Sequence, residues 1–266
     1  MEQENHLRSS HREVEPMAAL DDVDIDAAYA ELQCLPNDDL DKLSLLDDVA
    51  YLFLCRFDYL TNIVDLNKSV STREQAMRLT PDDHPDKARR MMDLSSSFMR
   101  RFQRLGSVSD LEQAMSLRAR IVEHCPDGHL DKPGYMNDFA VSLLSSFERF
   151  GDVKDIDKAI AALERSLQLC SDDNSHKLSF LANLSVAITR RFEFLGNIVD
   201  LKSAVSLSKE IATSTPNNTP SKSVVLNNLG MALMRHYERH GEFADVDEAI
   251  TAVQDAVRLT PEGHPS

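Results

Sequence analysis

One segment of this sequence recurs five times at a constant spacing. The last copy reads Asp-Val-Asp-Glu-Ala-Ile, and each earlier copy starts 45 residues before the next; the copies begin at Asp65, Asp110, Asp155, Asp200 and Asp245. A constant period of this size indicates one supersecondary unit per copy, with an apolar face too large for the unit to bury alone. Neighbouring units must therefore stack and form a continuous core along the array.

Each unit contains two segments with the apolar spacing of an amphipathic helix. The first segments cover residues 40–59, 87–104, 133–149, 178–194 and 222–239. The second segments cover residues 64–79, 109–124, 154–169, 199–214 and 244–259. The sequence thus predicts an all-α protein built from helix pairs.

Glycine and proline mark the ends of these helices. A glycine just after a helix takes the left-handed conformation at low cost, and proline cannot continue a helix. The glycines after the first helices are Gly106, Gly151, Gly196 and Gly241, with Thr61 in the first unit. We expect the turn at Thr61 to differ slightly from the others. The prolines after the second helices are Pro81, Pro126, Pro216 and Pro261, with Ser171 in the third unit.

Two further positions indicate how the helices pack. A small residue recurs in the second helix, which predicts a close approach between two helices; it is Ser69, Ala114, Ala159, Ala204 or Ala249. An aromatic residue recurs near the end of the first helix, and we interpret it as a packing wedge. It is Phe57, Phe102, Phe147, Phe192 or Tyr237.

The chain before the repeats has two parts. Residues 1–17 are polar and lack an apolar period, so we expect a disordered tail. Residues 18–35 have helical spacing and end before Pro36, which lies 45 residues before Pro81. We interpret them as the second helix of a degenerate leading repeat, so that the helical array spans residues 18–266.

Charge and composition exclude several classes of function. The formal net charge of −15 argues against binding to nucleic acid or to anionic membranes. The longest apolar run, residues 49–55, is too short to span a bilayer, and no secretory signal is visible at the N-terminus. The four cysteines form no CxxC pair, which predicts half-buried or buried free thiols and a cytoplasmic location.

The second helix of the last unit resembles that of the tetratricopeptide repeat. Ala249, Val253 and Ala256 precede Pro261, and Leu229 and Gly230 lie in the first helix. The resemblance implies a right-handed α-solenoid of antiparallel helix pairs. Phrases such as Leu-Asn-Asn-Leu-Gly look like the long repeats of fungal proteins that carry a caspase-like CHAT peptidase domain after the array. Such arrays usually close with a polar-faced helix, so we expect the last helix here to expose an apolar face and to offer a route to self-association.

Catalytic and metal-binding residues are not predicted. His236 and His240 share one helical face, but they stand in His-Tyr-Glu-Arg-His and no third ligand is near in sequence, so we expect a solvated helix end. The paired acidic residues lie near helix starts and loops, where they act as caps. We therefore expect no catalytic, cofactor-binding or metal-binding residue and no cofactor.

A peptide-binding groove is the best candidate site. In the resembled family the first helices line the concave face, which implies that a row of polar and apolar side chains faces a ligand there. The predicted residues are Arg100, Asn137, Arg190, Asn227, Met231 and Arg235. The arginines can pair with carboxylates of a peptide; alternatively, they pair with Glu or Asp on neighbouring units.

Two functions follow. The first is a non-enzymatic scaffold that binds a peptide or helix of another protein, of unknown identity, in its groove. The alternative is the regulatory or sensory array, or a truncated relative, of a caspase-like CHAT-domain peptidase. A reading frame that continues past Ser266 into a peptidase domain would favour the alternative.

Overall fold

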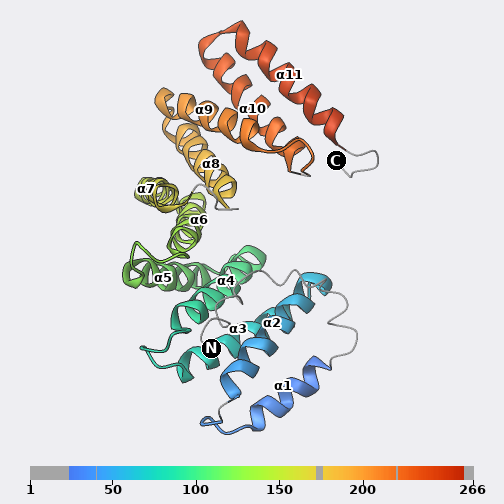
Figure 1. Cartoon of the computed structure of the whole chain (residues 1–266), viewed down its shortest axis with the longest axis vertical. Coiled ribbons are helices and arrows are strands. Elements are labelled where there is room, and N and C mark those ends of the chain that lie inside the picture. The colour runs from blue at the N-terminus through green and yellow to red at the C-terminus, as the bar shows by residue number, and fades with distance from the viewer. Residues whose placement is uncertain (1–23, 40, 172–175, 220, 261–266) are drawn as a thin grey trace, which may run out of the picture. The chain divides into compact units, whose positions relative to one another are not determined.

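The computed structural model describes residues 24–39, 41–171, 176–219 and 221–260, and every regular element in them is a helix (Figure 1). The eleven helices of these ranges are α1 (Ile25–Cys34), α2 (Lys42–Leu60), α3 (Ile63–Leu79), α4 (Lys87–Leu105), α5 (Val108–His124), α6 (Lys132–Phe150), α7 (Val153–Leu169), α8 (Lys177–Leu195), α9 (Ile198–Ser214), α10 (Lys222–His240) and α11 (Phe243–Leu259). The all-α prediction is confirmed, and the ends of α2–α11 lie within two residues of the predicted ranges. The expected disordered tail lies outside the described residues.

The described residues form two compact units, one ending at Leu117 and the other beginning at Arg118, so the division falls within α5. In the first unit α2 packs on α3, α1 packs on α2, and α3 packs on α4. In the second unit the pairs are α6 with α7, α8 with α9, and α10 with α11, and each second helix also contacts the first helix of the next pair. Figure 1 shows the two helices of one pair, α10 in orange and α11 in red, side by side.

The turn inside each helix pair has the same backbone geometry throughout. The glycines after α4, α6, α8 and α10 have φ between 69° and 72°, and the amide that follows each helix donates to a carbonyl four residues earlier at 2.7 Å. Thr61 takes the same left-handed conformation, with φ 55°, and donates to the Phe57 carbonyl at 2.7 Å. The expectation of a different turn there is therefore wrong, because the hydrogen bond imposes the geometry on a residue with a Cβ.

The predicted close approach lies between the two helices of a pair. A Cβ built on Gly230 of α10 would lie 2.7 Å from the Cγ2 of Val253 and 3.4 Å from the carbonyl oxygen of Ala249, both on α11. In the first pair Ser69 is fully buried and donates to the Ala50 carbonyl at 2.8 Å. Small residues on both helices thus let the two backbones come together.

A lysine begins the first helix of every pair, which sequence reasoning missed. The ammonium group of Lys222 donates to carbonyl oxygens at the end of the preceding helix, those of Ala212 and, at 2.7 Å, Thr215. Lys87 and Lys132 make equivalent bonds. These carbonyls have no partner within their own helix, so the lysine satisfies them and links successive pairs. The exact 45-residue recurrence of Lys42, Lys87, Lys132, Lys177 and Lys222 was the available signal.

The repeated Asp in the first turn of the second helix is buried in every repeat except the third, where Asp155 is half-buried, and a side chain nine residues earlier in the first helix binds it. Arg56, Arg101 and Arg191 each donate from Nε and Nη2 to the two carboxylate oxygens, at 2.6–3.0 Å. Asp110 and Asp200 are only 2% and 3% exposed. These hydrogen bonds raise the pKa of Arg101 above its ordinary value. We call this Arg–Asp pair the repeat clamp. In the third and fifth 45-residue repeats, Ser146 and His236 occupy the arginine position.

Candidate peptide-binding hollow

The second unit contains a hollow of about 340 Å³ between three helices. Two successive first helices, α8 and α10, form its sides, and α9 contributes Ser208 and Ile211. The remaining lining residues are Ala182, Ser185, Val186, Thr189, Arg190, Glu193, Val225, Asn228, Met231, Ala232 and Arg235. The hollow exists because α9 packs against both α8 and α10 and holds them as neighbours.

The lining combines exposed apolar surface with groups that can form hydrogen bonds. Val186 and Met231 are 47% and 48% exposed, although both lie among well-packed helices. The hydroxyl of Thr189 donates to its own helix, to the Ser185 carbonyl at 2.8 Å. Within the described part of the chain the exposed Asn228 side chain makes no hydrogen bond, so its amide is available to a ligand.

Three charged side chains share the hollow. Arg190 contacts Glu193 at 2.9 Å and Glu148 at 3.3 Å, and Arg235 contacts Glu193 at 2.8 Å. The hydrogen bond that Arg190 donates to Glu193, followed by the charges of Glu193 and Glu148, raises the pKa of Arg190. Two guanidinium groups and one carboxylate line the hollow itself, so it carries one excess positive charge in a chain whose net charge is −15.

Only part of the predicted row of groove residues lies together. Arg190, Met231 and Arg235 all line the hollow. Asn227 does not line it, whereas its neighbour Asn228 does, because one residue along a helix turns the side chain by about 100°. Asn137 is buried and accepts a hydrogen bond from Asn183 at 2.8 Å.

The alternative role given to the arginines, pairing with acidic residues of neighbouring units, is present in the structure. In the first unit Arg100 pairs with Asp58, as Arg190 pairs with Glu148 and Arg235 with Glu193. In all three pairs the acidic residue lies 42 positions before the arginine. The sequence contained this signal: where Ser145 replaces the arginine, the residue 42 positions earlier is the uncharged Gln103.

Comparison with known proteins identifies the fold. No family model and no curated protein matches the sequence. Among solved structures, a putative kinesin light chain of Podosopora anserina, described as nearly identical TPR-like repeats, is 15% identical; the match has a TM-score of 0.58 and covers 86% of this chain and 100% of that one. The chain has the tetratricopeptide-like repeat fold.

Two other solved structures share this tetratricopeptide-like fold. BtubC (BKLC) from P. vanneervenii is 15% identical, with a TM-score of 0.58 and coverage of 91% of this chain and 94% of that one. YrrB, described as a TPR protein with an unusual peptide-binding site, is 11% identical, with a TM-score of 0.50 and coverage of 90% and 95%. At these identities the likeness establishes the fold alone.

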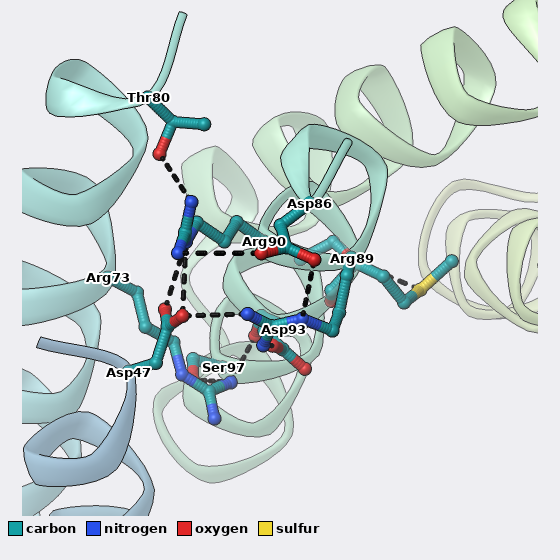
Figure 2. A network of polar contacts seen from close by, with 10 residues as sticks. Asp47, Arg73, Thr80, Asp86, Arg89, Arg90, Asp93 and Ser97 are labelled. Carbon is teal, nitrogen blue, oxygen red and sulfur yellow. Dashed lines mark hydrogen bonds and ion pairs between the residues drawn. The ribbon is translucent and has the colours of Figure 1, made fainter. Parts of the chain in front are cut away.

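A second polar cluster lies in the first unit of the tetratricopeptide-like array (Figure 2). Asp47 of α2 accepts hydrogen bonds from Arg89 at 2.7 Å and from Arg90 at 3.0 Å, both on α4. Arg73 of α3, which is 8% exposed, donates to the Asp93 carbonyl and, at 2.9 Å, to the Ser97 hydroxyl. Burial lowers the pKa of Arg73. These groups satisfy one another, so we interpret the cluster as a link between α2, α3 and α4.

His236 differs from the expectation of a solvated helix end. It is 9% exposed, and its Nδ1 lies 2.7 Å from Oδ2 of Asp245, at the arginine position of the repeat clamp. The fold also brings Glu242 close to both residues. The expectation failed because it treated the histidine alone and not as one member of a repeated position.

Two further predictions concern the burial of the cysteines and the length of the apolar helices. The four cysteines are free; Cys34 is exposed and the other three are half-buried, so Cys34 does not match the expected burial. None of the helices in the described ranges combines the length and apolar character needed to cross a bilayer.

Proposed function

We propose that this chain is a non-enzymatic interaction scaffold, and that the hollow between α8 and α10 binds a peptide or helix of another protein. The observation that carries the proposal is that two half-exposed apolar side chains, Val186 and Met231, line the same hollow as two arginines, Arg190 and Arg235. An apolar recess with a few polar groups at its edge is typical of ligand sites.

The lining defines the chemistry of the ligand. The recess takes an aliphatic or aromatic side chain against Val186 and Met231. A carboxylate of the ligand, next to that side chain, replaces Glu193 as the ion-pair partner of Arg235 or Arg190. Partly exposed ion pairs contribute about 0–1 kcal/mol, so this exchange costs little. Asn228 bonds the peptide backbone of the ligand.

A precedent for peptide binding exists among proteins of this fold. YrrB is a TPR protein with a peptide-binding site, which supports the same kind of function for this chain. The predicted contacts at Arg100, Asn137 and Asn227 stay predictions; none lines the hollow, and Asn137 is engaged by Asn183.

A selection from a displayed peptide library on the intact chain tests the proposal. We expect enriched peptides to carry an apolar residue beside an acidic one. Met231→Glu and Arg235→Glu should abolish their binding, whereas Val199→Glu, at a 62% exposed position of α9 outside the hollow, should leave it unchanged. Enriched peptides that bind all three variants equally would show that the hollow is not the site.

Three expectations from the sequence remain proposals. The four free cysteines support a reducing, cytoplasmic location. Ile250, Val253 and Val257 on α11 are 49%, 40% and 69% exposed, which supports self-association through the last pair. Light scattering that shows a monomer at all concentrations would eliminate self-association. The association with a CHAT-domain peptidase gains no support from the structural comparisons and stays a prediction.

A further inference from the structure

The fifth repeat clamp differs from the others in three positions at once. His236 replaces the clamp arginine. Glu242 stands where Asn62, Asp152 and Asn197 cap the second helix by accepting from a backbone amide, but Glu242 makes no such bond. His240 occupies a position that is a large apolar residue in every other unit, namely Leu60, Leu105, Phe150 and Leu195.

Two of these replacements, His236 and Glu242, meet beside Asp245, and His240 lies next to His236. The ligand atoms of His236, Glu242 and Asp245 all lie within 4.8 Å of one another, and the rings of His236 and His240 have centroids 4.4 Å apart. The residues come from both sides of the turn between α10 and α11. Ligand atoms around an ion with bonds of about 2.0–2.2 Å lie about 3–3.5 Å apart, so small rotations of these side chains suffice to surround one.

The carboxylate of Asp245 is less satisfied than its counterparts. In the arginine-containing clamps both carboxylate oxygens accept a hydrogen bond. Asp245 is only 8% exposed, and within the described residues its Oδ2 accepts from His236 while its Oδ1 has no hydrogen-bond partner. One carboxylate oxygen of Asp245 therefore carries no hydrogen bond from the described part of the protein and is available as a ligand for a cation.

We propose that His236, Glu242 and Asp245 bind a divalent transition-metal ion of the Zn²⁺ class, with His240 as a neighbouring fourth ligand. Imidazole nitrogen combined with carboxylate oxygen is a donor set that Zn²⁺ accepts, whereas Mg²⁺ prefers oxygen alone. The ion replaces the positive charge of the clamp arginine and joins α10 to α11. Arg235, on the same helix, is engaged by Glu193 in the hollow.

The other repeats supply variants that remove the ligands and still fit the fold. His236→Arg restores the clamp of Arg101 and Arg191, so this variant should fold and lose the metal. Glu242→Asn restores the cap made by Asn62 and Asn197, and it should weaken the affinity for metal by about tenfold or more. His124→Gln, at an exposed helix end in another 45-residue repeat, is the matched control.

The test is a titration of the intact, reduced chain with Zn²⁺ alone, read by calorimetry and by the thermal unfolding midpoint, with Mg²⁺ in parallel. We expect a site in wild type and His124→Gln that is absent in His236→Arg, and an unfolding midpoint that rises with Zn²⁺ but not with Mg²⁺. Equal Zn²⁺ affinity in all variants, or no Zn²⁺-dependent shift in wild type, would overturn the proposal.

Discussion

Arg101 and Asp110 lie on different helices, and the guanidinium donates to both carboxylate oxygens, at 2.8 and 2.6 Å. The carboxylate is almost completely buried and cannot recover its hydration when the arginine is removed. We therefore expect Arg101→Ala to lower the free energy of unfolding by about 2–4 kcal/mol, as measured by urea denaturation. The exposed Arg104→Ala is the control and should change it by less than about 0.5 kcal/mol. Equal effects would mean that the clamp contributes nothing specific.

Thr61 adopts a backbone conformation that suits glycine, with φ 55°. The left-handed conformation costs a residue with a Cβ about 1–2 kcal/mol, and the greater chain entropy of unfolded glycine offsets part of that. Thr61→Gly should therefore stabilise the protein by about 0.5–1 kcal/mol.

The reverse substitution in the next unit is the matched control for Thr61. Gly106 has φ 70° and open space around a built Cβ, so Gly106→Thr changes the backbone strain without a steric clash. We expect it to destabilise by about 1–2 kcal/mol in the same denaturation experiment. A stabilising Gly106→Thr would refute the account of this turn.

Lys222 satisfies two carbonyls at the end of α9 while it is 7% exposed. Lys222→Met keeps the length of the side chain but removes the donors, and the buried carbonyls lose their partner. We expect a loss of about 2–3 kcal/mol in the free energy of unfolding. Lys202→Met, at an exposed position of α9, should be near neutral. A neutral Lys222→Met would show that water replaces the ammonium group.

The pKa of Asp26 is lowered from 3.8 to about 2, chiefly by the hydrogen bond from Arg56 and then by that from Lys68. A lowered pKa means that the folded state favours the carboxylate, so the stabilisation is present above about pH 4 and is lost as the pH falls towards 2. Asp26→Asn should be less stable than wild type near neutral pH, by at most about 1 kcal/mol since the side chain is half exposed. The difference should fall to a small part of this value near pH 2 and vanish only below it, since the carboxyl group is half ionised at its pKa.

Denaturation of both proteins at several pH values measures this difference. Asp48→Asn, an exposed change on α2, corrects for the general effect of removing one negative charge. A difference between wild type and Asp26→Asn that is as large at pH 2 as near neutral pH would contradict the assignment.

Local sequence signals predicted the helices well. Gly106 and Pro81 end their helices through backbone constraints that act within a few residues, so the pattern alone places them. Thr61 was misjudged because its conformation depends on a hydrogen bond to Phe57 and not on its own preference. Lys222 was missed because its partners lie on another helix, although its recurrence was visible.

The site was harder to predict because it depends on the rotation of one helix against others. Arg190 and Arg235 line one hollow because equivalent residues of successive repeats face the same way, and their contact with a ligand stays a prediction. Asn228 lines the hollow and the predicted Asn227 does not, a difference of one residue that periodicity does not resolve. Ile211 lines the hollow because α9 packs beside α10, and no pattern within one 45-residue repeat reveals that contact.

Site-specific photo-crosslinking to a library-selected peptide tests the central claim most directly. A photoreactive amino acid replaces Val186 on α8 in one protein and Val199 on α9 in another; both positions are exposed, but only Val186 lines the hollow. If the hollow binds the peptide, crosslinks form from position 186, fall when Arg235 is changed to Glu, and are absent from position 199. Crosslinks of equal yield from both positions, unaffected by Arg235→Glu, would contradict the proposed site.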